Sequence, residues 1–172
     1  MTRRIPFCML LLPLVLAACG FRPLYGAANG GSPAPGLSLA GIYVEPIPER
    51  VGYQLRNDLF DGLGSSGREN GAAYRLKLIL RERTEGVTLQ RDATITRYNY
   101  TLIAHYELIP VGAATPIKSG DVSALSAFNV ASSPYATVIA ERDAADRAAG
   151  DIADRIRTEL AVYFREIAGG LN

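Results

Sequence analysis

A strict alternation of apolar and polar side chains in the middle of the chain constrains the fold more than any other feature. From residue 98 to residue 108 every second side chain is apolar or aromatic: Tyr98, Tyr100, Leu102, Ala104, Tyr106 and Leu108. The side chains beside and between them include Arg97, Asn99, Thr101, His105 and Glu107. Successive side chains of a strand point to opposite faces of a sheet. The pattern therefore predicts a long strand, reaching Ile109, with one packed face and one face that is wet or covered by a partner.

Three further strands are predicted, over Leu37–Ile47, Ala73–Arg83 and Ile117–Val130. In the second of these, the side chains on the apolar face are Tyr74, Leu76, Leu78 and Leu80. Those on its polar face include Arg75, Lys77 and Arg81. We expect the Thr-Glu-Gly sequence at residues 84–86 to turn the chain toward the next strand, and residues 110–116 to form a loop.

Two segments have the periodicity of amphipathic helices. After Glu49, apolar side chains recur every four residues and stop before Gly64: Val51, Leu55, Leu59 and Leu63. A long helix is predicted from Ser133, an N-cap followed by a first-turn proline, to about Ala168, where two glycines end it. Gly150 is a candidate point of bending. The apolar positions of this helix include Val138, Ala145, Ala149, Ile152, Ile156, Leu160, Tyr163 and Ile167.

The order of these segments (strand, helix, three strands, helix) determines the predicted architecture. Each helix has one apolar stripe and the sheet has one apolar face, so the economical arrangement packs both helices on the same side of the sheet. We therefore predict an α+β fold, a two-layer sandwich of a largely antiparallel four-stranded sheet with two helices packed on one face. The predicted single domain spans residues 37–172.

The beginning of the chain has the features of a lipoprotein signal peptide. Arg3 and Arg4 precede an apolar run from Ile5 to Leu16, which is too short to cross roughly 30 Å of hydrocarbon as a helix. The run ends in Leu-Ala-Ala-Cys, and Cys19 is the predicted site of cleavage and fatty acylation. We expect a signal peptide over residues 1–18 and a lipidated tether, rich in glycine and proline, over residues 19–36.

Two alternatives apply to this segment. It could be an ordinary signal peptide with a chance cysteine, and the arginine pair could be a twin-arginine export signal. Gly20 follows the cysteine in place of the aspartate that, by analogy with other lipoproteins, retains them in the inner membrane. The sequence therefore predicts a protein anchored by acyl chains to the periplasmic side of the outer membrane.

The charge balance and the residue types exclude several classes of function. Removing residues 1–18 lowers the number of basic residues from 18 to 16 against 17 acidic ones, a net charge of −1. A near-neutral chain argues against a general nucleic-acid binder. Cys8 leaves with the signal peptide and Cys19 is acylated, so we expect no disulfide and no cysteine metal site.

The sequence also lacks recognisable catalytic equipment. The one histidine, His105, lies in the middle of a predicted strand, and there is no serine elbow, phosphate-binding loop or zinc-binding helix motif. Acidic side chains of the last helix lie beside arginines and are explained by a solvated charged face. These residues are Asp143, Asp146, Asp151 and Asp154. We therefore expect a non-enzymatic binding or scaffolding protein without metal or cofactor.

Four arginines are predicted to lie near the turn that joins the two long strands: Arg81, Arg83, Arg91 and Arg97. Guanidinium groups bind phosphates through paired hydrogen bonds, so these residues could contact an anionic glycolipid such as lipopolysaccharide. For any single residue, the alternative interpretation is that the charge keeps an exposed strand soluble.

The segment Cys19-Gly20-Phe21-Arg22-Pro23-Leu24-Tyr25-Gly26 resembles the opening of the LptE lipoproteins in their alphaproteobacterial form. The similarity extends along essentially the whole chain. It includes the strand that begins Ile-Thr-Arg-Tyr-Asn-Tyr at residue 95, the hydrophobic stretch that ends at Ile109-Pro110, and the charged helix at the C-terminus.

This resemblance implies a non-enzymatic partner that sits inside the large outer-membrane barrel LptD. There it would act as a plug, help the barrel to assemble, and enable delivery of lipopolysaccharide to the outer leaflet. The resemblance also implies lipopolysaccharide contacts through basic residues near the strand ends. The matching positions are Arg91 first, then Arg97 and Arg142.

Two other functions compete with this hypothesis. A periplasmic carrier of a lipid or lipoprotein would need an apolar cavity between the sheet and the helices. An envelope hydrolase would need clustered acids with perturbed pKa values, or a serine–histidine pair, around His105.

Overall fold

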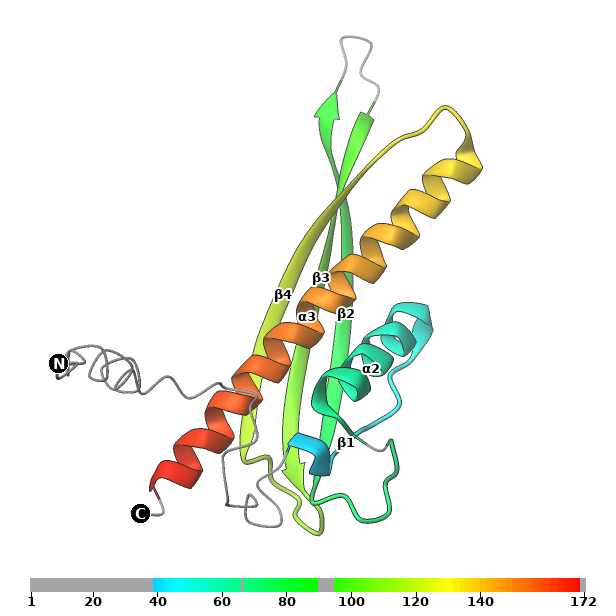
Figure 1. Ribbon diagram of the computed structural model, residues 1–172. Coiled ribbons are helices and arrows are strands. Elements are labelled where there is room, and N and C mark those ends of the chain that lie inside the picture. Colours follow the sequence, from blue (N-terminus) through cyan, green and yellow to red (C-terminus); the bar gives the residue numbers. More distant parts are fainter. Residues whose placement is uncertain (1–38, 66, 90–94, 171–172) are drawn as a thin grey trace, which may run out of the picture. The chain divides into compact units, whose positions relative to one another are not determined.

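The computed structural model describes residues 39–65, 67–89 and 95–170. The chain divides into two units, residues 1–32 and 33–172, and all the described residues belong to the second. The predicted signal peptide, Cys19, the whole tether and Arg91 lie outside the described residues. The elements are η2 (Leu39–Gly41), β1 (Ile42–Val44), α2 (Glu49–Leu63), β2 (Tyr74–Leu89), β3 (Ile95–Pro110), β4 (Lys118–Asn129) and α3 (Pro134–Gly170) (Figure 1).

The strands form one sheet in the order β1-β2-β3-β4. β2, β3 and β4 are antiparallel to their neighbours in the sheet, whereas the short β1 runs parallel to β2. The sheet is therefore mixed, and the predicted α+β class with a four-stranded sheet and two helices is confirmed. β1 is shorter than the predicted first strand because η2 precedes it and Pro46 and Pro48, which have no N–H to donate, follow it.

The predicted turn at residues 84–86 is wrong. β2 continues to Leu89, with Thr84 opposite Tyr100 and Gly86 opposite Tyr98. The pairing register shifts after Gly86, as in a β-bulge, so the glycine accommodates an irregularity within the strand in place of a reversal of the chain. The reversal between β2 and β3 falls in residues 90–94, outside the described residues.

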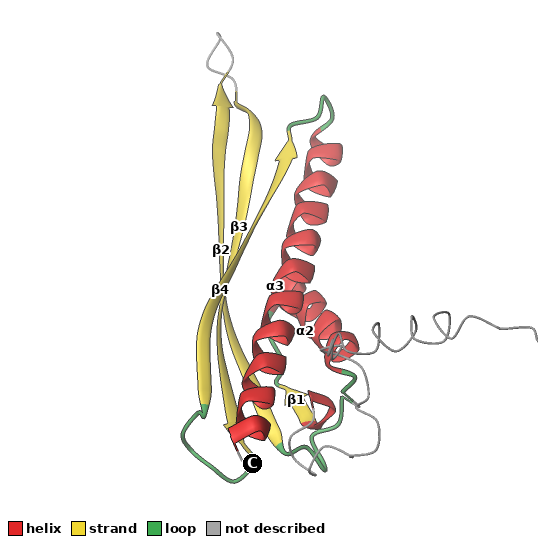
Figure 2. Ribbon diagram, turned by 60° about the vertical axis from the view of Figure 1, so that its left-hand side comes forward, coloured by secondary structure: helices red, strands yellow, loops and turns green. Residues whose placement is uncertain are grey.

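Both helices cover the same face of the sheet (Figure 2). The alternating side chains predicted for the packed face are buried, and they join the apolar stripes of both helices in one core. Its largest fully buried members are Tyr100, Tyr106, Ile42, Leu55, Leu59, Leu76, Leu102, Leu108, Ile152, Ile156, Leu160 and Val44. Ala144, Ala145, Ala148 and Ala149 are also buried, and side chains of this size let α3 approach its neighbours closely.

The glycine after α2 and the proline that begins α3 agree with the sequence signals, whereas α3 includes Gly169 and Gly170, which were predicted to end it. Gly64 follows α2 in the left-handed conformation, with φ 63°, and its N–H donates to the carbonyl of Asp61 at 3.3 Å. α3 begins at Pro134, directly after Ser133, and continues through Gly150 as one helix to Gly170. None of the helices in the described part of the chain combines the length and apolar character needed to cross a membrane.

Candidate functional site

The face of the sheet that points away from the helices carries an apolar diagonal. Ile79, Ile103 and Leu125 are 51%, 37% and 62% exposed, respectively. The register places Ile79 opposite His105, which is two residues from Ile103, and places Leu125 opposite Thr101, also two residues from Ile103. Side chains related in this way are diagonal neighbours on one face. We call these three residues the outer apolar diagonal.

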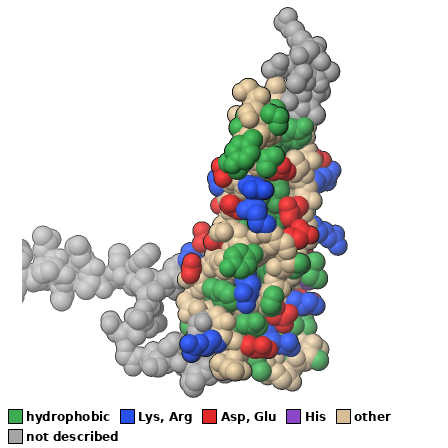
Figure 3. Space-filling model, turned by 90° about the vertical axis from the view of Figure 1, so that its right-hand side faces the viewer, with side chains coloured by type: hydrophobic (Ala, Val, Ile, Leu, Met, Phe, Trp, Pro, Cys, Tyr) green, Lys and Arg blue, Asp and Glu red, His purple; other side chains and the backbone are tan. Residues whose placement is uncertain are grey.

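Charged side chains surround this diagonal and pair with one another. His105 Nδ1 lies 3.0 Å from a carboxylate oxygen of Asp121, and Lys77 Nζ lies 3.8 Å from Glu107. Exposed pairs of this kind contribute little to stability, so the charges remain available to a partner. On the side of the molecule that carries β2 and α2, apolar patches also alternate with charged ones (Figure 3).

His105 lies on the outer face of the sheet, directly opposite Asp121. Among the described residues its ring lies beside two carboxylates, Asp121 at 3.0 Å and Glu107 at 3.9 Å. With Ile79, Arg81 and Ile103 nearby, His105 and Asp121 line a shallow depression of about 240 Å³. No group of three or more potential metal ligands occurs in the part of the chain that the structure describes.

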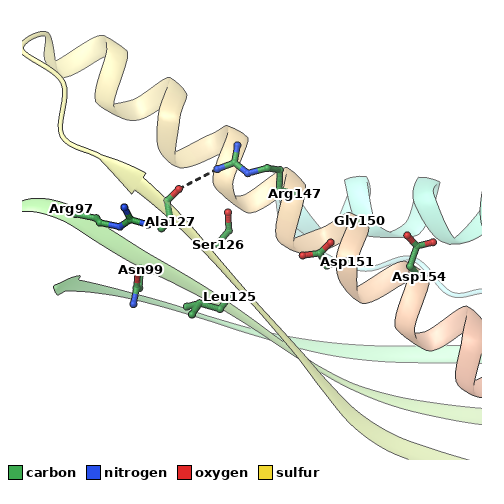
Figure 4. Close-up of a pocket in the computed structure, with 9 residues that line it drawn as sticks. All are labelled: Arg97, Asn99, Leu125, Ser126, Ala127, Arg147, Gly150, Asp151 and Asp154. Atoms are coloured by element: carbon green, nitrogen blue, oxygen red, sulfur yellow. Dashed lines mark hydrogen bonds between the residues drawn. The ribbon is translucent and has the colours of Figure 1, made fainter. Parts of the chain in front are cut away.

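A larger depression, of about 750 Å³, lies where α3 runs beside β4 (Figure 4). Arg97 and Arg147 lie toward one end of it, and Asp151 and Asp154 toward the other. Nη2 of Arg147 donates to the carbonyl of Ala127 at 3.2 Å, and Arg157 lies 3.1 Å from Asp154. The remaining lining residues are Asn99, Leu125, Ser126, Ala127 and Gly150.

The arginine end of this depression continues into a neighbouring one of about 330 Å³, which Arg97 and Arg147 also line. Both guanidinium groups are exposed, and the side chain of Arg97 has no hydrogen-bond or ion-pair partner among the described residues. Guanidinium groups that line one depression can bind a phosphate or carboxylate through charge-assisted hydrogen bonds. We call Arg97 and Arg147 the arginine pair.

The structure places the three predicted lipopolysaccharide contacts differently from one another. Arg97 lines both depressions, and Arg91 lies outside the described residues. Arg142 lines neither depression; its carbonyl accepts a hydrogen bond from Arg50 of α2 at 3.3 Å. Arg147 was not among the predicted residues, because its approach to Arg97 depends on how α3 packs along β4.

Two tyrosine hydroxyls connect the buried face of the sheet to its surroundings. The hydroxyl of Tyr100 donates to Glu82 at 2.7 Å, and that of Tyr106 donates to Glu159 of α3. Burial, and then the hydrogen bond to the carboxylate, raises the pKa of each tyrosine above its usual value. Both tyrosines therefore remain neutral donors and help to hold the strands against the rest of the fold.

Comparison with solved structures supports the same fold. A candidate lipoprotein from Caulobacter crescentus CB15 is 24% identical with a TM-score of 0.62, covering 76% of this chain and 95% of that one. Rare lipoprotein B from Shewanella oneidensis is 12% identical with a TM-score of 0.54, covering 74% and 96%. A minor lipoprotein from Acinetobacter baumannii is 13% identical with a TM-score of 0.53, covering 71% and 89%. At these identities the likeness shows the fold alone.

Sequence comparison adds two findings. An uncharacterised protein of Rickettsia prowazekii (strain Madrid E), RP188, is 23% identical over 156 residues, which are 91% of this chain and 95% of that protein. The model of the LptE family, described as lipopolysaccharide-assembly, matches residues 39–160, well over half of the 172-residue chain. The chain therefore belongs to the LptE family of lipopolysaccharide-assembly proteins.

Proposed function

We propose that this chain is a non-enzymatic lipoprotein, anchored through acyl chains on Cys19 to the periplasmic side of the outer membrane. There it plugs an LptD-type β-barrel, helps the barrel to assemble, and enables insertion of lipopolysaccharide into the outer leaflet. Membership of the LptE family and the similar lipoproteins support this role. The observation that carries the proposal is the outer face of the sheet, which the helices leave uncovered although it bears apolar side chains.

The chemistry of the outer face suits the inside of a wide barrel. A barrel of this kind has a polar, water-lined interior, and paired charges such as Lys77 with Glu107 can face it without a large desolvation cost. The outer apolar diagonal adds a contact that gains free energy when water is excluded. Complete burial of one partly exposed aliphatic side chain contributes on the order of 1 kcal/mol. Ile79, Ile103 and Leu125 therefore favour a tight contact over a freely solvated surface.

The arginine pair supports a lipopolysaccharide contact within this role. Arg97 and Arg147 present two guanidinium groups at one end of the 750 Å³ depression, where phosphates of a glycolipid could be bound. Arg91 and Arg142 remain proposed contacts from the family resemblance. The acidic end of the depression, with Asp151 and Asp154, would direct an anionic group toward the arginine pair.

The carrier alternative has less support. An acyl-chain carrier needs apolar space between the sheet and the helices, whereas the sheet side chains on that side pack into a common core with α2 and α3. The depression of about 750 Å³ at the edge of β4 has charged residues at both ends, and the groove of about 610 Å³ between α2 and β2, which has apolar walls, also has Glu49 and Glu82 in its lining.

Co-purification from outer membranes tests the plug proposal. The full-length protein is extracted in mild detergent, and we expect an LptD-type barrel to accompany it in a one-to-one complex. Replacing both Ile103 and Leu125 with aspartate should reduce the recovered barrel strongly, because charges would be buried against the barrel wall. The control is Tyr53→Asp, which introduces the same charge at an exposed apolar side chain of α2, outside the outer apolar diagonal. Recovery of the wild-type protein without any barrel would refute the proposal.

A further inference from the structure

The rest of the chain covers the backbone groups of one edge of the sheet but leaves most of those on the other edge uncovered. Along β4, side chains of α3 occupy outward carbonyl groups: Arg155 donates to Ser123 at 2.7 Å, and Arg147 donates to Ala127 at 3.2 Å. Along β2, the short β1 pairs only with residues 74–76. Beyond Leu76 no strand lies beside the outer edge of β2 in the part of the chain that the structure describes.

A groove lies where β1 would continue along β2. Glu45 makes one further bond, from its N–H to the carbonyl of Leu76 at 2.9 Å, and the chain then turns away through two prolines into α2. The groove has a volume of about 610 Å³. Its walls are the first turn of α2, with Pro48 and Val51, and the edge of β2, with Leu78 and Leu80.

The backbone along this groove can pair with another strand. The carbonyl of Leu76 points to the edge, because it accepts the bond from Glu45. Alternate residues of a strand direct their N–H and C=O groups to the same side, so those of Leu78, Leu80 and Glu82 also point into the groove. An open row of donors and acceptors of this kind recruits extended polypeptide by strand addition.

The side chains on the two sides of the β2 edge specify the partner. On the helix side, Leu78 and Leu80 make an apolar surface together with Val51. Glu49 and Glu82 also line the groove, and Glu82 accepts a hydrogen bond from Tyr100. On the outer side, Arg81 is exposed and has no ion-pair partner among the described residues, and Arg83 makes only an exposed pair with Glu85 at 2.6 Å. A strand beside β2 also alternates its side chains between these two sides.

We propose that the open edge of β2, from Leu78 to about Thr84, is a strand-addition site for an extended segment of another protein in which apolar and acidic side chains alternate. The apolar side chains enter the groove beside Leu80, and the acidic ones pair with Arg81 and Arg83. The backbone edge and the groove lie beside the outer apolar diagonal and share Ile79 and Arg81 with its surroundings, but strand addition does not depend on the barrel proposal.

A second copy of this chain fits the same edge less well than an acidic strand. Two copies that paired antiparallel through β2 with Glu82 at the centre would bring Arg81 of one copy opposite Arg83 of the other. Like charges directly across a strand pair are destabilising. Charge complementarity therefore selects an acidic partner strand over self-association.

Peptide binding to the purified full-length protein tests the site. The probe is a fluorescein-labelled peptide of about eight residues that alternates valine and glutamate, and the comparison probe alternates valine and lysine. We expect the glutamate peptide to bind more tightly and to slow the amide hydrogen exchange of Leu78, Leu80 and Glu82. Arg81→Glu should weaken its binding about fivefold and strengthen binding of the lysine peptide. Arg165→Glu, an exposed change of equal charge on α3, should leave both affinities unchanged.

Four results would overturn the proposal. The two peptides could bind the wild-type protein equally, which requires no variant and so does not depend on variant folding. Exchange could slow along β4 and not along β2. The β2 amides could become protected at high protein concentration without peptide, which would assign the edge to a second copy. A fluorescent fatty acid could displace the peptide from the groove, which would make it a lipid site.

Discussion

The two faces of β3 come from one strand but have opposite surroundings. Leu102, Ala104, Tyr106 and Leu108 are fully buried under the helices, whereas Ile103, between two of them, is partly exposed to solvent. The same alternation of side chains therefore supplies both the core and an uncovered surface. The covered face contributes most of the free energy of folding through apolar burial, because water is excluded there.

This difference means that folding and recognition can be changed separately. A substitution on the covered face removes packed contacts and acts on stability, whereas a substitution on the outer face acts mainly on a partner. Neighbouring residues of one strand can therefore be used as matched pairs, since their backbone environment is nearly the same.

The largest expected effect comes from the covered face. Leu102→Ala removes a fully buried side chain from the core and should lower the free energy of unfolding by about 2–5 kcal/mol. Urea denaturation followed by circular dichroism measures this loss. The matched control is Ile103→Ala, which shortens a partly exposed side chain on the opposite face. It should lower the free energy of unfolding much less. Equal decreases in the free energy of unfolding for the two variants would show that the covered face does not contribute more to stability than the outer face.

Added volume on the covered face should also be costly. A Cβ placed on Gly120 would lie 2.9 Å from Cε1 and from the hydroxyl oxygen of Tyr106. That ring is fully buried and its hydroxyl is bonded to Glu159, so it has little room to move. Gly120→Ala should therefore destabilise the protein by about 1–3 kcal/mol. Ser119→Ala, at an exposed neighbouring position, is the control, and a similar loss there would contradict the expected clash.

The Tyr106 hydroxyl gives a smaller effect with a pH signature. Burial and Glu159 raise the pKa of Tyr106, so the unfolded chain ionises first as the pH rises past about 10. The stabilisation of the folded state by the neutral Tyr106 hydroxyl is therefore fully present below that pH and is lost above it. Tyr106→Phe should cost about 1 kcal/mol at neutral pH and should flatten the loss of stability in alkali. Thermal unfolding of both proteins from about pH 8 to about pH 11 measures the slopes, and parallel slopes would exclude this role.

The parts of the fold that follow from local pattern were predictable from sequence. The alternation around Leu102 identified the buried face of β3, and the four-residue spacing from Val51 to Leu63 identified α2 with its glycine end. The continuation of β2 through Gly86 was not predictable in this way. Pairing of Gly86 with Tyr98 on the neighbouring strand overrides a local turn signal, and the irregularity falls after the glycine, where the register shifts past Val87.

The candidate site was predictable only in part, for a related reason. Strand periodicity predicts only that Arg97 alternates with the packed side chains of β3, whereas Arg147 comes to line the same depression through the packing of α3 along β4. Sequence spacing contains no information on which sheet edge a helix follows. Arg142 precedes Arg147 by five residues, which turns it about 140° around the helix axis, toward α2 and Arg50.

The smallest effect on stability, and the sharpest separation of the two faces, is expected at Leu125. Its side chain is mostly exposed on the outer face, and threonine is well tolerated in strands, so Leu125→Thr should change the free energy of unfolding by no more than about 0.5 kcal/mol. If the outer apolar diagonal contacts a barrel wall, the same variant should still reduce recovery of the barrel, because the contact loses apolar area. A normal yield of complex together with a large loss of stability would reverse the assignment, and Leu125 would belong to the folding face.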